Sequence, residues 1–310
     1  MTTSPAPLVP YAADEVVSAA QLSARGVDSH EVRRLLRAGV LHRLCTGWYA
    51  TRPPTSDADR HVLKARAVLR HLGGRAALSH QSRVVIAGLP VWRADLRAVH
   101  VTRIRDEVTR RRPHLVSHSQ VSGLHITSVP GLGPVVPVAV AIVQTGLVAG
   151  GMDAAIAADA ALHGKRLTHD DLRAATELLA GHRGVRRTAA ALERCDGRHE
   201  SPGETRLAHV LADLGIAVTP QFEVSTRLGT RWADFRIDGT RVLLEFDGKV
   251  KYTDPNRAGD VLWQEKRRQD ALEDEGWIVM RVTWAELDDP NALVLRIRAA
   301  IVRSRGPQPR

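Results

Sequence analysis

The sequence predicts an α/β chain, α+β overall, with a basic helical front, a mixed α/β middle region and a C-terminal α/β core around a mixed sheet. Three observations support this fold class. The 310 residues exceed a typical single domain, so several compact units are expected. The apolar content of 44% and the charged content of 25% are typical of globular proteins. Helical apolar periods and alternating strand-like runs follow one another along the chain.

The first folded region is expected at residues 13–52, after a Pro-rich tail at 1–12. Helix signals at 18–26 and 30–38 precede two short strand-like runs about a turn within 40–50. Helix, turn, basic helix and hairpin is the order of a winged helix-turn-helix, whose second helix enters the DNA major groove. The region therefore predicts a DNA-binding domain. The alternative is a helical hairpin whose arginines are only solvated.

The second helix of this region is amphipathic. Its inner face carries Val32, Leu35 and Leu36. Arginines on its outer face and on the following hairpin would contact DNA and its backbone. The candidate DNA-binding residues of this region are Arg33, Arg34, Arg37 and Arg43.

Residues 58–197 are expected to form a mixed α/β middle domain, behind a Pro-containing linker at 51–57. Its predicted helices are at 62–72 and 153–163, and its predicted strands at 98–103 and 124–129. Five arginines lie within 103–112 and either contact phosphates or form an exposed turn. The nearby histidines are scattered rather than at the spacing of metal ligands: His114, His118 and His125.

Residues 131–152 contain no charge and are long enough to span a bilayer. Pro134 and Pro137 interrupt the segment, which favours a buried strand followed by a core helix over a membrane span. The N-terminus lacks the basic and apolar regions of a signal peptide. Cys45 and Cys195 lack a CxxC partner. A cytoplasmic protein without disulfides or membrane contact is the simplest expectation.

The last folded region is expected at residues 200–304, before a tail at 305–310. Ser201-Pro-Gly-Glu204 has the spacing of a capping box with proline in the first turn, which predicts the start of a helix. Asp238-Gly239 lies between alternating runs and predicts a hairpin with a two-residue turn. The elements expected after this hairpin are a charged helix at 260–275, a strand at 277–284 and a helix at 291–303.

The hairpin register gathers acidic side chains. A two-residue turn pairs Asp234 with Leu243 and Trp232 with Glu245, so Asp234 and Glu245 are diagonal neighbours roughly 7–8 Å apart. Together with Asp247 they share one face, because side chains alternate along a strand. The opposite face is apolar and carries Phe235, Ile237, Val242, Leu244 and Phe246. Acids this close favour a divalent cation such as Mg²⁺ between them. The alternative is an edge strand that its charges protect from aggregation.

Charge is unevenly distributed over a net +10. Residues 1–199 contain 27 Lys and Arg against 16 Asp and Glu, whereas residues 200–290 contain 12 against 18. A basic front joined to an acidic module favours a polyanion-binding part joined to a metal-binding part. The alternative is that the arginines reflect a GC-rich genome.

Several of these motifs carry a family resemblance. Ser201-Pro-Gly-Glu204, Asp234, Glu245-Phe-Asp-Gly248, the helix at 265–270 and Gly276-Trp277 resemble the PD-(D/E)xK nuclease superfamily, in the branch similar to very-short-patch-repair endonucleases. The front half, including residues 43–49, resembles the N-terminal winged-helix domain of AbiEi-type abortive-infection antitoxins. The resemblance implies a restriction-endonuclease-like core at the C-terminus.

The resemblance also implies metal-dependent hydrolysis of DNA phosphodiesters. Asp234, Glu245 and Asp247 would hold Mg²⁺ or Mn²⁺, and Glu204 could act as a further ligand directly or through water. A lysine normally follows the second acid of the motif by two residues. Asp247 occupies that position here, as an additional ligand or a general base. The lysines that could serve instead are Lys249, Lys251 and Lys266.

Two functions follow as hypotheses. The first is a cytoplasmic, Mg²⁺-dependent DNA endonuclease or nicking enzyme in phage defence or DNA repair, with further DNA contacts from Lys251, Lys266 and Arg268. The second is a noncatalytic AbiEi-like transcriptional regulator or antitoxin that carries a degenerate nuclease fold and has a cognate toxin as partner. The position of Asp247 supports the second hypothesis.

Overall fold

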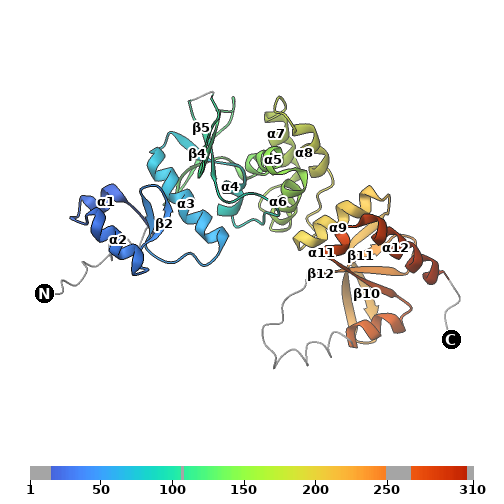
Figure 1. The fold of residues 1–310 in the computed structure, drawn as a ribbon. Helices are drawn as coiled ribbons and strands as arrows, with labels where there is room; N and C mark the ends of the chain where they lie inside the picture. Colours follow the sequence, from blue (N-terminus) through green and yellow to red (C-terminus); the bar gives the residue numbers. More distant parts are fainter. Residues whose placement is uncertain (1–14, 106–107, 249–266, 306–310) are drawn as a thin grey trace. The chain divides into compact units, whose positions relative to one another are not determined.

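The structure is a computed structural model that describes residues 15–105, 108–248 and 267–305 (Figure 1). It contains helices and three sheets, two of them with both parallel and antiparallel strand pairs, which confirms the predicted α+β class. The chain divides into two compact units. Unit 1 comprises Met1–Ala158 and Leu167–Glu193, and unit 2 comprises Asp159–Arg166 and Arg194–Arg310.

Unit 1 contains the predicted order of helix, helix and hairpin, preceded by a strand that the sequence did not predict. Its elements are β1 (Val16–Ser18), α1 (Ala19–Ser23), α2 (Ser29–Arg37), β2 (His42–Cys45) and β3 (Trp48–Ala50), with the strands in the order β1-β3-β2. The carboxylate of Asp28 accepts hydrogen bonds from the backbone N–H groups of His30 and Glu31 and so caps α2. Val32 and Leu35 are buried beneath the helix, as the amphipathic pattern predicts.

The segment predicted as a linker at 51–57 is held in place. Arg52 donates hydrogen bonds to Glu15 at 2.7 Å and to Asp59 at 2.6 Å. Residues 15–50, called the winged region below, and helix α3 (Asp57–Leu72) contribute to one apolar cluster. Its members are Val16, Leu44, Ala50, Leu63 and Ala67. The winged region and the middle region therefore belong to one compact unit.

The middle region is built on a six-stranded sheet in the order β6-β7-β5-β4-β9-β8. Its strands are β4 (Ala76–Leu78), β5 (Val99–Arg103), β6 (Arg110–Arg112), β7 (Leu115–His118), β8 (Thr127–Val129) and β9 (Gly133–Val135). Its helices are α3, α4 (His80–Ile86), α5 (Val138–Ala149), α6 (Gly151–His163), α7 (His169–Leu178) and α8 (Val185–Leu192). The β5–β7 and β4–β9 pairs are parallel, and the other pairs are antiparallel.

The uncharged segment 131–152 forms strand β9 and helix α5, as its interrupting prolines predict. Among the described residues, no helix has the length and apolar character needed to cross a membrane. Part of the arginine run at 103–112 forms β6, an exposed strand at the edge of the six-stranded sheet. Charged side chains protect such an edge from pairing with other chains.

Unit 2 contains a four-stranded sheet in the order β10-β11-β12-β13, with a parallel β12–β13 pair beside antiparallel neighbours. Its elements are α9 (Pro202–Asp213), β10 (Val218–Thr226), β11 (Gly229–Ile237), β12 (Val242–Asp247), a helix at 267–274, β13 (Ile278–Thr283), α11 (Trp284–Leu287) and α12 (Pro290–Ser304). Helices α9 and α12 pack on one sheet face, and Leu272 lies in the apolar cluster on the other (Figure 1).

Strand β10 is not predicted from the sequence, because Pro220 interrupts the run from Val218 to Thr226. Proline cannot donate a ladder hydrogen bond and is tolerated mainly in edge strands. Strand β10 is an edge strand of its sheet, because it pairs with β11 on one side and with no strand of the described sheet on the other. The following residue, Gln221, has a positive φ of 48°.

Candidate functional site

The β11–β12 hairpin carries the predicted acids in a register that differs from the predicted one by two residues. Phe235 pairs with Leu244, and Arg236 pairs with Leu243. A shift of two preserves the faces, so the predicted apolar face is confirmed: Phe235, Ile237, Val242, Leu244 and Phe246 all belong to one cluster. The strand pairing ends at Phe235 and Leu244. Asp234 and Glu245 are the next residues beyond it, and the charge of Glu245 raises the pKa of Asp234.

The predicted two-residue turn at Asp238-Gly239 is wrong for a local reason. Thr240 donates hydrogen bonds from its backbone N–H, at 3.2 Å, and from its hydroxyl, at 2.8 Å, to the carbonyl of Ile237. The backbone bond is also made in a two-residue turn. The departure is at Val242, whose N–H donates to Thr240 Oγ1 at 3.1 Å instead of to the carbonyl of Phe235 on the partner strand. The turn therefore takes four residues, 238–241, and moves every pairing by two.

Asp234 is the most perturbed acid of the site. Its Oδ2 accepts a hydrogen bond of 2.6 Å from the backbone N–H of Phe246 on the neighbouring strand. Burial raises the pKa of Asp234 to about 7, and the charges of Glu204 and Glu245 contribute in the same direction. The hydrogen bond from Phe246 and the charge of Arg268 oppose this shift. Burial is therefore the main cause of the raised pKa of Asp234.

Glu245 has a cationic partner. The Nη2 atom of Arg268, on the helix at 267–274, lies 3.0 Å from its Oε1. The same guanidinium donates a hydrogen bond of 2.9 Å to the carbonyl of Trp232. Arg268, predicted to contact DNA, thus lies beside the acids. Asp247 ends β12 and pairs with Thr283 of the parallel strand β13.

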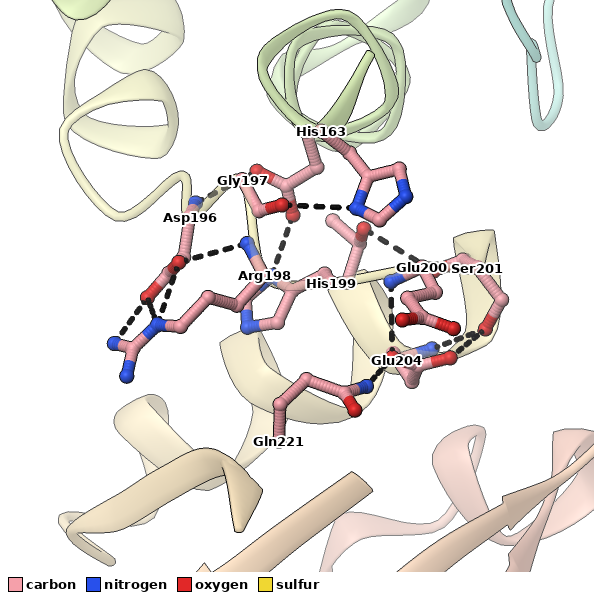
Figure 2. A network of polar contacts seen from close by, with 11 residues as sticks. His163, Asp196, Gly197, Arg198, His199, Glu200, Ser201, Glu204 and Gln221 are labelled. Atoms are coloured by element: carbon pink, nitrogen blue, oxygen red, sulfur yellow. Dashed lines mark hydrogen bonds and ion pairs between the residues drawn. The ribbon is translucent and has the colours of Figure 1, made fainter. Parts of the chain in front are cut away.

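Glu204 is buried at the start of α9 and has several hydrogen-bond partners (Figure 2). Its carboxylate accepts hydrogen bonds from Ser201 Oγ at 2.7 Å and from the backbone N–H of Glu200 at 3.0 Å. Gln221 of β10 donates a third at 3.2 Å. Ser201 caps α9 as predicted, since its Oγ accepts from the Glu204 N–H. The second half of the predicted capping box differs, because the Glu204 carboxylate accepts from the N–H of Glu200 and not from that of Ser201. The charge of Glu204 also raises the pKa of Asp234.

A glycine allows α9 to approach the acids. A Cβ atom on Gly203 would lie 1.9 Å from the Phe246 ring, so a larger residue does not fit there. The same ring meets Trp284 edge to face, with ring centroids 4.7 Å apart. This packing fixes the helix start that carries Glu204 against the end of β12, where Glu245 and Asp247 lie.

The segment before α9 is fixed by a buried hydrogen bond between His199 and Asp159. His199 Nδ1 lies 2.6 Å from Asp159 Oδ2, and both side chains are almost completely buried. The other oxygen of Asp159 accepts from the backbone N–H of Asp196 at 2.8 Å. His163 contacts the carbonyl of Gly197 at 3.0 Å (Figure 2). These contacts determine where the chain enters α9. The nearby thiol of Cys195 is buried and forms no disulfide, and burial raises its pKa.

Among the described residues, no three carboxylates bring ligand atoms close enough together to form a preformed metal site. The predicted lysines Lys249, Lys251 and Lys266 lie outside the described residues. The acids therefore offer a paired arrangement, Asp234 with Glu245, to which Glu204 adds charge. Carboxylate oxygens of this kind suit Mg²⁺ or Mn²⁺.

The described residues contain one cluster suited to a metal that the sequence analysis missed: His80, His100 and His118. Their spacings of 20 and 18 residues match no ligand motif. The parallel pairing of β5 with β7 brings two of them together, and that pairing is a property of the sheet topology. No local signal in the sequence indicates it.

The candidate DNA-binding arginines lie on the winged region. Arg33 and Arg43 line one hollow of about 470 Å³ between α2 and the hairpin. Arg33, Arg37 and Arg43 are exposed, and none has an ion pair within the described part of the chain. Arg34 differs, because its guanidinium lies 2.6 Å from the carboxylate of Glu31. Within that part of the chain, three of the four predicted arginines thus present unpaired charge.

Comparisons with known proteins add little to this geometry. No family model matches the chain, and a search of curated proteins finds no match. The chain is similar to the crystal structure of the RV2827C protein from Mycobacterium tuberculosis, with 17% sequence identity and a TM-score of 0.39. The similarity covers 70% of this chain and 86% of that chain. A likeness this distant carries no argument about function.

Proposed function

We propose that this protein is a DNA endonuclease or nicking enzyme that depends on Mg²⁺ or Mn²⁺ and binds DNA through its winged helix. The observation that carries the proposal is the closeness of three carboxyl groups, since the charges of Glu204 and Glu245 both act on the partly buried Asp234. Burial and these neighbouring acids raise the pKa of Asp234 to about 7. A divalent cation at this position would offset the repulsion between the carboxylates.

Each residue of the site has a role in this proposal. Asp234 and Glu245 would hold the cation. The bound ion would make a water molecule nucleophilic near neutral pH and stabilise charge on the phosphate. Arg268 would exchange its hydrogen bond to Glu245 for one to a DNA phosphate, for which a guanidinium is well suited. Glu204 remains a capping residue whose charge favours cation binding.

The element order of unit 2 supports the same proposal. A helix, three antiparallel strands, a helix and a strand parallel to the third correspond to the restriction-endonuclease-like core that the sequence motifs imply. The acids lie on its two central strands, β11 and β12. This correspondence is one of topology, and function depends on the site.

A second candidate is a noncatalytic DNA-binding regulator with a degenerate nuclease fold. The Arg268–Glu245 ion pair favours it, because the guanidinium already neutralises one of the two proposed ligands. This candidate requires DNA binding by the winged region without cleavage. The two candidates therefore differ in a single observable, the metal-dependent cutting of DNA.

The test is cleavage of supercoiled plasmid DNA by the purified full chain. We expect nicked or linear products with Mg²⁺ or Mn²⁺ and none with EDTA. Glu245→Gln should reduce cleavage to background. The control is Glu223→Gln, the same substitution at an exposed position of β10, which should cleave like the wild type. Cleavage that survives Glu245→Gln would exclude this site, and binding without cleavage would favour the regulator.

The winged region has its own test. We expect Arg33→Ala/Arg37→Ala to weaken DNA binding and to lower the slope of log K against log salt by about 0.9 for each phosphate that is no longer neutralised. Arg34→Ala is the matched control, since Arg34 is paired with Glu31. Fluorescence anisotropy at several salt concentrations measures both quantities. An unchanged slope in the double variant would show that another surface binds DNA.

A further inference from the structure

Three histidines from separate elements of unit 1 meet in its six-stranded sheet. His80 begins α4 directly after β4, His100 lies within β5 and His118 ends β7. One ring nitrogen of each lies within 4.8 Å of the others. His80 and His100 are buried, and His118 is partly exposed. The cluster therefore has a solvent-facing side.

The spacing of the nitrogens is close to that of metal ligands. His100 Nδ1 lies 2.9 Å from His118 Nε2. The rings of His80 and His118 are stacked, with centroids 3.7 Å apart. Two nitrogens bound to a tetrahedral zinc ion at 2.0–2.1 Å are roughly 3.3 Å apart. An ion would therefore be admitted by a small opening of the His100–His118 pair and a rotation of the stacked His80 or His118 ring, so that each ring aims a nitrogen at the ion.

Neighbouring side chains hold the outer nitrogens. Ser79 Oγ lies 2.9 Å from His80 Nδ1, which leaves Nε2 of His80 for a metal. Gln81 Nε2 lies 3.0 Å from His100 Nε2, which leaves Nδ1. Metal-binding histidines usually make such a hydrogen bond through the nitrogen that does not bind the ion. Ser79 and Gln81 are both buried.

Gln81 supplies an independent observation. Its Oε1 atom is buried and has no hydrogen-bond partner among the described residues. When a metal binds Nδ1 of His100, Nε2 of that ring carries the proton and becomes a donor. Rotation of the Gln81 amide would then turn the unpartnered oxygen toward this donor. The amide thus has an acceptor that suits the Nε2–H tautomer of His100, which is the tautomer that leaves Nδ1 for a metal.

The histidines are in the protonation state that binds metals. Burial lowers the pKa of His100 to about 3 and of His118 to about 4, and the charge of Arg111 contributes to both shifts. Neutral imidazole is the form that binds a metal ion. His80 also has a positive φ of 51°, a strained conformation for a residue other than glycine. The fold therefore holds His80 in a strained backbone conformation, which costs conformational free energy.

We propose that His80, His100 and His118 form a binding site for one zinc-type transition-metal ion, with a fourth coordination position open to an exogenous ligand. Three imidazoles suit Zn²⁺, Cu²⁺ or Ni²⁺, whereas the carboxylates of unit 2 suit Mg²⁺. The site is separate from the acids and does not depend on the proposed nuclease function.

The test is Zn²⁺ binding to the metal-stripped full chain, measured by isothermal titration calorimetry. An Asp234→Asn/Glu245→Gln background removes binding by the acids. We expect one ion per chain and at least tenfold weaker binding in His118→Ala. Ser79→Ala, which keeps all three histidines, should weaken binding by about 10–100-fold. The control is His125→Ala at an exposed position, which should bind like its parent.

Visible absorption of bound Co²⁺ provides a second readout, because its intensity reports a tetrahedral nitrogen site. We expect the absorption in the parent and in His125→Ala, and its loss in His118→Ala. Circular dichroism checks that each variant is folded. The absence of Zn²⁺ binding by the parent, or equal affinity in His118→Ala, would overturn the proposal and leave the cluster as a hydrogen-bonded part of the core.

Discussion

Asp234→Asn is expected to abolish metal-dependent DNA cleavage and, at the same time, to stabilise the folded protein above pH 7. The first effect follows because an amide is a much weaker ligand for Mg²⁺ than a carboxylate. The second follows because the ionised Asp234 is half-buried near two other acids. Asparagine can still accept the hydrogen bond from the Phe246 N–H, so the hairpin keeps this contact.

The sign of the stability effect follows from proton linkage. The carboxyl of Asp234 has its ordinary pKa of 3.8 in the unfolded chain and a pKa of about 7 in the folded protein. Between these values the folded state retains a proton that the unfolded state has released. The contribution of Asp234 to the free energy of unfolding therefore falls by up to about 1.4 kcal/mol per pH unit as the pH rises. Above pH 7 the contribution of Asp234 to the free energy of unfolding no longer changes with pH.

Urea unfolding of wild type and Asp234→Asn over this pH range measures the effect. We expect the difference in the free energy of unfolding to grow between about pH 4 and pH 7, in favour of the variant, and then to level off. Glu223→Gln, at an exposed position, should show no such trend. Parallel stability curves for wild type and Asp234→Asn would contradict the proposed burial of Asp234.

The second large effect is expected for His199→Ala, which removes a hydrogen-bond partner of the buried Asp159 side chain. Removing the partner of a buried polar group typically costs about 1–3 kcal/mol, and more for a charged group. The pair also fixes the segment that leads into α9 and Glu204 (Figure 2). We therefore expect a lower unfolding midpoint in urea and reduced cleavage in the same variant.

His163→Ala is the matched control for this prediction. His163 is exposed and contacts a backbone carbonyl of the same network, so its removal should change stability by less than about 0.5 kcal/mol. The double variant His199→Ala/Asp159→Ala should lose less stability than the sum of the two single variants, because the partners interact directly. If the double variant instead lost the sum of the two single stability losses, His199 and Asp159 would not stabilise each other.

Local patterns predicted much of unit 2. The capping box at Ser201 and Glu204 indicates the start of α9, and alternation indicates the apolar face of the hairpin. Both signals depend on residues close together in sequence. The positions of the acids on the polar side of β11 and β12 follow from the same alternation.

The remaining features depend on contacts between distant residues. The register differs at Val242, whose N–H bonds to the Thr240 hydroxyl. The Arg268–Glu245 pair joins residues 23 positions apart. Pro220 conceals the edge strand β10. The histidine cluster requires the parallel pairing of β5 with β7, which no spacing in the sequence indicates.

The central claim, that Asp234 takes part in binding a divalent cation, is tested most directly by the titration of its carboxyl group. Carbon-13 NMR of aspartate-labelled protein follows this carboxyl, and Asp234→Asn identifies its signal. Without metal we expect a pKa of about 7. Saturating Mg²⁺ should lower the pKa well below this value, because a bound cation favours the ionised form. The same pKa with and without Mg²⁺ would contradict the claim.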